Sequence, residues 1–241
     1  MTTTDPGRTP RDTRAVLAGL VAAAMIGATI AVLGAQWRWG DAVKSAQGRF
    51  QLAQQALQDG YDKEAVALFS QLAAQNNGEA QYWLGHMTED GLGVARDPTK
   101  AIELYRQAAA HAVVAAERRL GEIYLEGNLV LPDFAQAKTY LEKAAYHGDN
   151  DAALLLGRMY RDGVGMSADP VQVYAWLEVA NLEGNAAARV ERDDALGKMS
   201  ASDQQAAIAR AADIYNQITH KAPPQTAHAP WRELLRALRD Q

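Results

Sequence analysis

Few residues in this chain have the types and spacing that catalysis or metal binding requires. The run His86-Met87-Thr88-Glu89 differs from the H-E-x-x-H pattern of zinc hydrolases, and no second pair of ligands has suitable spacing. The chain has no cysteine, which excludes disulfides, thiolate metal sites and a cysteine nucleophile. Adjacent carboxylates such as Glu89-Asp90 are typical of solvated helix ends. We therefore expect no catalytic, metal-binding or cofactor-binding residues and a protein that is not an enzyme.

Charge and alanine content narrow the class of protein further. The 24 Lys and Arg residues against 29 Asp and Glu give a formal net charge of −5. Nucleic-acid-binding domains are usually basic, so we expect no nucleic-acid partner. Alanine accounts for 48 of the 241 residues, and it favours closely packed helices over sheets. The composition predicts an all-α fold.

A membrane anchor is predicted near the N-terminus. Residues 15–35 carry no charged side chain, and a helix of that length would span about 31 Å, close to the hydrocarbon core of about 30 Å. Trp37 and Trp39 follow where interfacial aromatic residues are expected. We assign residues 1–14 to a cytoplasmic tail and 15–36 to a transmembrane helix. A cleaved signal peptide is the alternative.

The charges on either side of this segment bear on its orientation in the membrane. Basic residues flank it equally, with Arg8, Arg11 and Arg14 before it and Arg38, Lys44 and Arg49 after it. Large domains translocate largely regardless of charge. We therefore expect a single-pass inner-membrane protein with its N-terminus in the cytoplasm and the following domain in the periplasm; a cytoplasmic domain is the alternative.

Small residues recur every fourth position within the predicted membrane helix. This pattern allows two membrane helices to approach closely, and it favours a partner transmembrane helix. The residues that would pack there are Gly19, Ala23, Gly27 and Ala31.

A repeat of 36 residues organises the middle of the chain. Leu-Gly pairs recur at 84–85, 120–121 and 156–157, single glycines at 91, 127 and 163, and aspartates at 97, 133 and 169. Each unit is predicted to hold two helices, the first ending at the single glycine and the second beginning at the aspartate. Glycine inside a helix costs about 1 kcal/mol relative to alanine. We therefore expect the paired helix to cross closely at each Leu-Gly pair.

These units resemble the Sel1-like repeats, a branch of the tetratricopeptide superfamily. The resemblance rests on the A-x3-L-G start, the turn Gly91-Leu92-Gly93-Val94, the Asp-Pro step and the closing Ala-Ala pairs. The middle unit lacks the second turn glycine, so we expect a rebuilt loop there. The resemblance implies a right-handed α-solenoid of helix-turn-helix repeats. It would comprise a tetratricopeptide-like first unit at 41–78, three Sel1-like repeats at 79–189 and capping helices at 190–218.

The resemblance also implies a concave groove that binds proteins or peptides. First-helix residues flanking the Leu-Gly pairs would line it, namely Tyr82, His86, Glu89, Arg118, Glu122, Arg158 and Arg161. Arginines on such a surface can hold an acidic segment through paired hydrogen bonds. The alternative is a solvated face that binds nothing.

A second interaction element is predicted at the C-terminus. Residues 219–230 contain three prolines and are expected to form an extended linker. Residues 231–241 would then form an amphipathic helix whose apolar face comprises Trp231, Leu234, Leu235 and Leu238. A helix of about 11 residues is marginally stable alone in water. We therefore expect it to dock on the solenoid, on a partner's groove or on a lipid surface, with protein favoured over lipid.

Together these features predict a membrane-anchored interaction scaffold without a cofactor. Its partner would be a protein or peptide in the bacterial envelope, and it would assemble or support a membrane or periplasmic complex. One alternative is a periplasmic regulator that sequesters a sensor or signalling protein. Another, implied by the resemblance alone, is an envelope hydrolase of the penicillin-binding repeat type, although this chain lacks the cysteines of those proteins.

Overall fold

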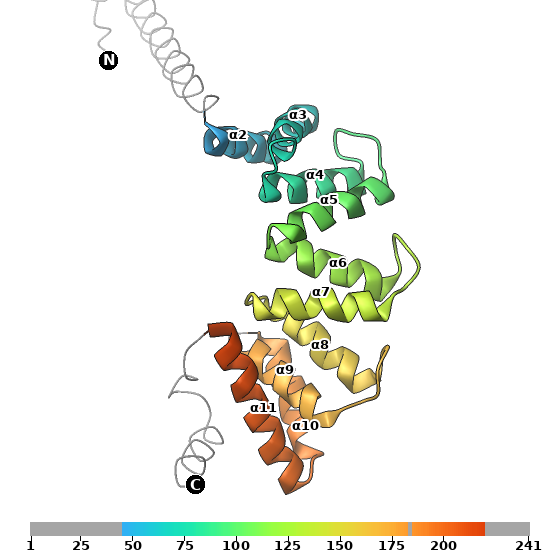
Figure 1. Ribbon diagram of the computed structural model, residues 1–241, viewed down its shortest axis with the longest axis vertical. Helices are drawn as coiled ribbons and strands as arrows, with labels where there is room; N and C mark the ends of the chain where they lie inside the picture. The colour runs from blue at the N-terminus through green and yellow to red at the C-terminus, as the bar shows by residue number, and fades with distance from the viewer. Residues whose placement is uncertain (1–44, 183–184, 220–241) are drawn as a thin grey trace, which may run out of the picture. The chain divides into compact units, whose positions relative to one another are not determined.

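The computed structural model describes residues 45–182 and 185–219, and all regular secondary structure in these ranges is helical. The helices, shown in Figure 1, are α2 (Ala46–Gln58), α3 (Asp62–Ala73), α4 (Gly78–Asp90), α5 (Pro98–Ala110), α6 (Val114–Glu126), α7 (Phe134–Tyr146), α8 (Asn150–Asp162), α9 (Pro170–Leu182), α10 (Ala186–Gly197) and α11 (Ala201–Thr219). This succession of helices confirms the all-α prediction. The chain divides into two compact units, Met1–Leu68 and Phe69–Gln241.

The described part of the first unit contains α2 and the start of α3. The hydroxyl of Ser45 accepts the N–H of Gly48 at 2.9 Å and caps the N-terminus of α2. Gly60, with φ +79°, supplies the left-handed residue that turns the chain from α2 to α3. Ala53 and Ala65 are fully buried.

The second unit is a stack of helix pairs in chain order. Helix α4 packs on α5, α6 on α7 and α8 on α9, and each pair packs on the next. Beyond the third pair, both α10 and α11 pack on α9 (Figure 1). The right-handed sense of the helical stack and its concave groove stay predictions.

The glycines of the Leu-Gly pairs are the points of closest approach within each pair. A Cβ atom on Gly85 would lie 2.9 Å from Cε1 of Tyr105, and one on Gly121 would lie 2.6 Å from Cγ of Leu141. In the third pair, a Cβ atom on Gly157 would lie 2.9 Å from Cγ of Leu177. The predicted close crossing is therefore confirmed in all three pairs, and the crossing residue itself recurs every 36 positions.

The predicted helix boundaries are also confirmed. The first helices end at Gly91, Gly127 and Gly163, which are left-handed with φ of 77°, 71° and 66°. The carboxylate of Asp97 accepts the N–H of Lys100 at 3.0 Å, and that of Asp133 accepts the N–H of Gln136 at 3.0 Å. Asp169 likewise accepts two N–H groups at the start of α9. Each of these aspartates therefore supplies the N-cap of its helix.

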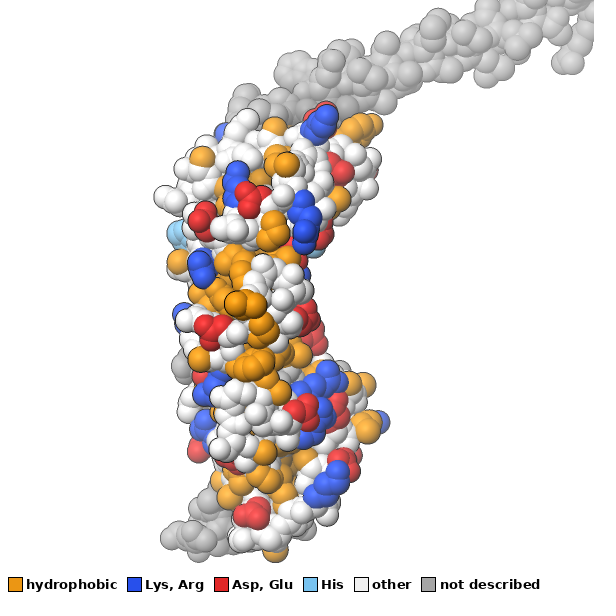
Figure 2. Space-filling view, turned by 90° about the vertical axis from the view of Figure 1, so that its right-hand side faces the viewer, with side chains coloured by type: hydrophobic (Ala, Val, Ile, Leu, Met, Phe, Trp, Pro, Cys, Tyr) orange, Lys and Arg blue, Asp and Glu red, His pale blue; other side chains and the backbone are white. Residues whose placement is uncertain are grey.

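The loop of the middle pair follows a different path, as expected. Gly93 and Gly165 have φ of 66° and 69°, whereas Leu129, which occupies the equivalent position, does not have positive φ. Beyond it, Leu131 is 88% exposed and Phe134 is 38% exposed. The face that carries these loops shows a band of hydrophobic side chains in Figure 2.

Several predicted elements lie outside the described residues. These are the transmembrane helix with Gly19, Ala23, Gly27 and Ala31, the linker beyond Thr219, and the tail helix with Trp231, Leu234, Leu235 and Leu238. Among residues 45–182 and 185–219, no helix combines the length and apolar character that crossing a bilayer requires.

Candidate functional site

The seven predicted groove residues lie on the first helices of three consecutive pairs. Tyr82, His86 and Glu89 come from α4, Arg118 and Glu122 from α6, and Arg158 and Arg161 from α8. Ion pairs join α4 to α6 and α8 to α10. The polar faces of α4, α6, α8 and α10 are called the first-helix surface below.

Glu89 is an interior residue of this surface. It is only 8% exposed, and its carboxylate accepts a hydrogen bond from the hydroxyl of Tyr105 at 2.7 Å. Arg119 donates two further hydrogen bonds to it, one from Nε at 3.1 Å and one from Nη2. Burial acts to raise the pKa of Glu89, but the hydrogen bonds from Arg119 and Tyr105 outweigh it and hold the pKa below 4.5. Glu89 is therefore ionised and already occupied by its own chain.

The same contact affects Tyr105. Burial raises the pKa of its hydroxyl, and the neighbouring Glu89 carboxylate raises it further. The hydroxyl therefore stays protonated and donates to the carboxylate at all physiological pH values.

A chain of ion pairs continues from Glu89 across α6. Arg119 also donates to Glu122 at 3.1 Å, and Glu122 accepts from Arg118 at 2.6 Å. Arg118 in turn donates from Nε to Asp149 at 3.0 Å. Asp149 is the N-cap of α8, where it accepts the N–H of Ala152 at 2.8 Å. The network thus links the first helices of all three pairs.

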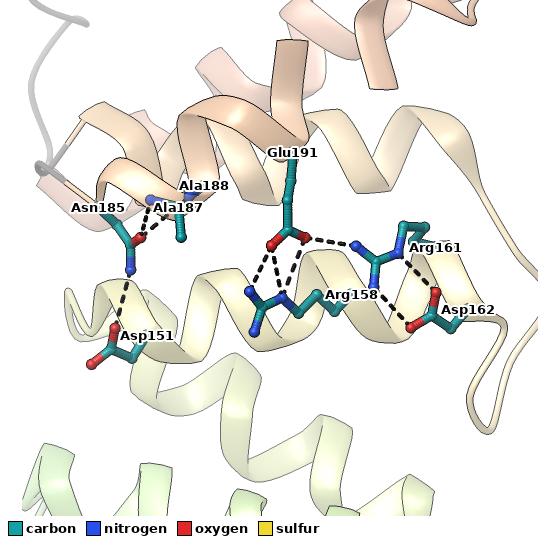
Figure 3. Close-up of polar contacts among 8 residues, drawn as sticks. All are labelled: Asp151, Arg158, Arg161, Asp162, Asn185, Ala187, Ala188 and Glu191. Carbon is teal, nitrogen blue, oxygen red and sulfur yellow. Dashed lines mark hydrogen bonds and ion pairs between the residues drawn. The ribbon is translucent and has the colours of Figure 1, made fainter. Parts of the chain in front are cut away.

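A second cluster joins α8 to α10, as Figure 3 shows. Arg158 donates to Oε1 of Glu191 from Nε at 3.0 Å and from Nη2 at 2.6 Å. Arg161 donates to Oε2 of the same carboxylate at 2.7 Å and to Asp162 at 2.8 Å. The hydrogen bonds from Arg158 hold the pKa of Glu191 below its usual value, against the opposing effect of burial.

These pairs leave part of the surface accessible to solvent. The side chains of Arg118, Arg158 and Arg161 are 31%, 39% and 46% exposed. His86 is 42% exposed and lies 3.3 Å from Asp90. Tyr82 is half-buried, with its ring centroid 5.8 Å from that of Tyr105. The predicted residues therefore divide into an interior one, Glu89, and a set that is partly exposed to solvent.

Sequence reasoning missed three members of this surface, Arg119, Asp149 and Glu191. A signal was present, because oppositely charged residues stand 30 to 33 positions apart in Glu89 and Arg119 and in Arg158 and Glu191. That spacing is slightly below the repeat length, and it pairs one first helix with the next.

No metal-binding cluster adds to the site within the described ranges. Among residues 45–182 and 185–219, no three His, Asp or Glu side chains are grouped so that they could hold a metal ion.

Comparison with known proteins identifies the repeats. Residues 78–112, 114–149 and 150–185 match the model of the Sel1 repeat. The crystal structure of a Sel1 repeat protein from Oxalobacter formigenes is similar over 82% of this chain and 90% of that one, with a TM-score of 0.61 and 24% identity. No curated protein matches the chain.

A second similar structure is that of c5321, a protective antigen that is present in uropathogenic Escherichia coli strains and displays an SLR fold. It is 26% identical, and the match covers 80% of this chain and 48% of that one, with a TM-score of 0.49.

The matched stretches coincide with the helix pairs α4–α5, α6–α7 and α8–α9. The Oxalobacter protein shares the helical stack, which confirms the predicted solenoid architecture at the level of the fold. Repeats of this kind indicate a scaffold for protein–protein interaction. The chain therefore contains three consecutive Sel1 repeats, formed by its helices α4 to α9.

Proposed function

We propose that this protein is a membrane-tethered scaffold that holds an acidic segment of a partner protein on its first-helix surface. The repeats support the interaction role, and the uncharged run at residues 15–35 supports the tether. The observation that carries the binding site is the set of partly exposed arginines on consecutive first helices. Arg118 lies on α6 and Arg158 on α8.

The chemistry of these arginines suits a carboxylate-bearing partner. A guanidinium presents five N–H donors in a plane and binds a carboxylate through two parallel hydrogen bonds. Glu191 engages Nε and Nη2 of Arg158 and Nη1 of Arg161, while both side chains remain partly open to solvent. An incoming carboxylate therefore competes with Glu191 for the same donors.

The test uses cross-linking in intact membranes, followed by identification of the proteins joined to the repeats. Replacing Arg118 and Arg158 together by alanine should abolish the cross-link to the partner. The matched control removes one cation from α5 and one from α11, Lys100→Ala with Arg210→Ala, and should leave the cross-link unchanged. Full retention of the partner by the Arg118→Ala, Arg158→Ala variant would overturn the proposal.

The substitution Glu191→Gln should change partner binding in the opposite direction. It removes the competing charge without removing an arginine, so it should strengthen binding of an acidic partner. A purely structural role for these ion pairs predicts weaker binding for this variant as well.

We also propose that the protein is a single-pass inner-membrane protein whose repeats face the periplasm and support an envelope complex. The length of the uncharged run supports the anchor. A reporter enzyme that is active only in the periplasm should therefore be active when it is fused after Gln241. Activity of a reporter that works only in the cytoplasm, with none from the periplasmic reporter, would contradict this topology.

A further inference from the structure

A pocket of about 280 Å³ lies at the C-terminal end of the second unit, between α8, α9, α10 and α11. Its apolar lining includes Tyr160, Val173 and Met199. A cavity of this size can accommodate one large side chain that is delivered by a longer segment.

The charged lining of the pocket is predominantly acidic. Four carboxylates and two cations line it, namely Asp169, Glu191, Asp194, Asp203, Arg161 and Lys198. Both cations already have carboxylate partners, because Arg161 donates to Glu191 at 2.7 Å and Lys198 to Asp194 at 2.5 Å. Asp169 and Asp203 instead bind polar groups of helix starts. The excess of negative charge favours a segment that carries basic residues.

An exposed apolar side chain lies beside this pocket. Val190 on α10 is 66% exposed, and it precedes the pocket residue Asp194 by one helical turn. A segment that fills the pocket can therefore also cover Val190 with a second apolar residue.

The C-terminal segment of this chain has the matching composition. Residues 231–239 read Trp231-Arg232-Glu233-Leu234-Leu235-Arg236-Ala237-Leu238-Arg239. Residues 231–241 as a whole combine one large aromatic residue, three leucines and three arginines against Glu233 and Asp240, a net side-chain charge of +1. As a helix, the segment would present its aromatic residue and its leucines on one side.

The length of the intervening chain allows this segment to return to the pocket. Asp203 lies in the first turn of α11, which ends at Thr219, so the helix carries the chain about 24 Å from the pocket. The residues from His220 to Pro230, if extended like polyproline, span about 34 Å. The extended linker is therefore longer than the distance from the end of α11 back to the pocket.

We propose that residues 231–239 dock on the pocket of their own molecule. Trp231 fills the cavity between α8 and α10, a leucine covers Val190, and the arginines face Asp194 and Asp203. The site is thus an intramolecular contact between the tail and the end of the repeat stack.

The absence of native cysteine makes a disulfide test specific. In the full-length protein, Val190→Cys combined with Leu235→Cys should form an intramolecular disulfide on mild oxidation. The control pairs Leu131→Cys with Leu235→Cys, since Leu131 is the most exposed large hydrophobic residue of the described chain. We expect the first pair to oxidise at least about tenfold faster, because docking raises the effective concentration of the two thiols. Free thiols are counted by maleimide labelling.

Other occupants give different results. Equal oxidation rates for the two pairs would overturn the proposal, as expected of a tail that is free or held on lipid. A disulfide that links two molecules on a non-reducing gel would also overturn it and assign the tail to a second copy.

The charge component has its own test in the same background. Asp203→Lys should slow formation of the 190–235 disulfide severalfold, and adding Arg232→Glu should restore most of the rate. Trp231→Ala should slow it as well. Unchanged rates in both Asp203→Lys and Trp231→Ala would exclude this pocket as the docking site.

Discussion

Arg158 on α8 donates two hydrogen bonds to one carboxylate oxygen of Glu191 on α10, at 3.0 and 2.6 Å. The pair joins the third Sel1 repeat to the helix that follows it. The first-helix surface therefore continues beyond the last matched repeat. Its arginines form ion pairs between successive helix pairs and are also the groups that we propose bind the partner.

The ion pairs of this surface should differ in their contribution to stability. Arg119→Ala leaves the buried carboxylate of Glu89 without its cation, which we expect to cost about 2–4 kcal/mol in free energy of unfolding. Arg158→Ala breaks a partly exposed pair and should cost no more than about 1 kcal/mol. Urea denaturation of both variants and the wild type measures the difference. Equal losses would contradict the interior placement of Glu89.

Glu89 should make stability depend on pH in acid. Its pKa is lowered in the folded protein, so its contribution is fully present above the ordinary value of 4.5 and is lost as the pH falls through the lowered value. Glu89→Gln cannot ionise, and its stability should change less between pH 5 and 3. Urea midpoints measured across this range test the prediction, which fails if the two proteins lose stability in parallel.

Gly121→Ala should destabilise the middle repeat. The added Cβ atom would lie 2.6 Å from Cγ of Leu141 and 3.3 Å from its backbone nitrogen. We expect a loss of about 1–3 kcal/mol in spite of the higher helix propensity of alanine.

Gly197→Ala is the matched control for this substitution. Gly197 ends α10, and a Cβ atom there would meet nothing within 4 Å. This variant should be as stable as the wild type or gain up to about 1 kcal/mol. Thermal unfolding of both variants tests this difference. If both substitutions shift the melting temperature in the same direction, the close approach of the helices at Gly121 is contradicted.

Ala112→Gly should stabilise the turn after α5. Ala112 has φ of 56°, a left-handed conformation that costs an L-residue about 1–2 kcal/mol. The greater freedom of glycine in the unfolded chain offsets part of the gain, so we expect about 0.5–1 kcal/mol. The reciprocal change is Gly148→Ala at the equivalent turn, where φ is 92°, and it should lower the melting temperature. A lower melting temperature for Ala112→Gly would contradict the prediction.

The sequence was most informative where backbone geometry restricts the residue type. A left-handed helix end favours glycine, as at Gly127, and the first turn of a helix favours an acceptor such as Asp133. Glycine inside a helix has a cost that only close packing explains, as at Gly121 against Leu141. These requirements recur in each repeat, so the period of 36 was visible without the structure.

The polar contacts of the site could not be predicted in the same way. Pairing between Glu89 and Arg119 depends on how far one first helix is displaced from the next and on which rotamers the neighbours allow. Long charged side chains at such spacing can also point to solvent, and no backbone rule distinguishes the two outcomes. Glu89 was therefore predicted as a partner-binding residue, whereas the structure shows it buried among groups of its own chain.

The most direct test of partner binding compares cross-linking yields in intact membranes for the wild type, Arg118→Ala with Arg158→Ala, and Glu191→Gln. All three should be present at similar levels, because the affected pairs are partly exposed. We predict that the double variant loses the partner and that Glu191→Gln binds more of it. Wild-type yields in both variants would contradict the proposal that the first-helix surface holds an acidic partner.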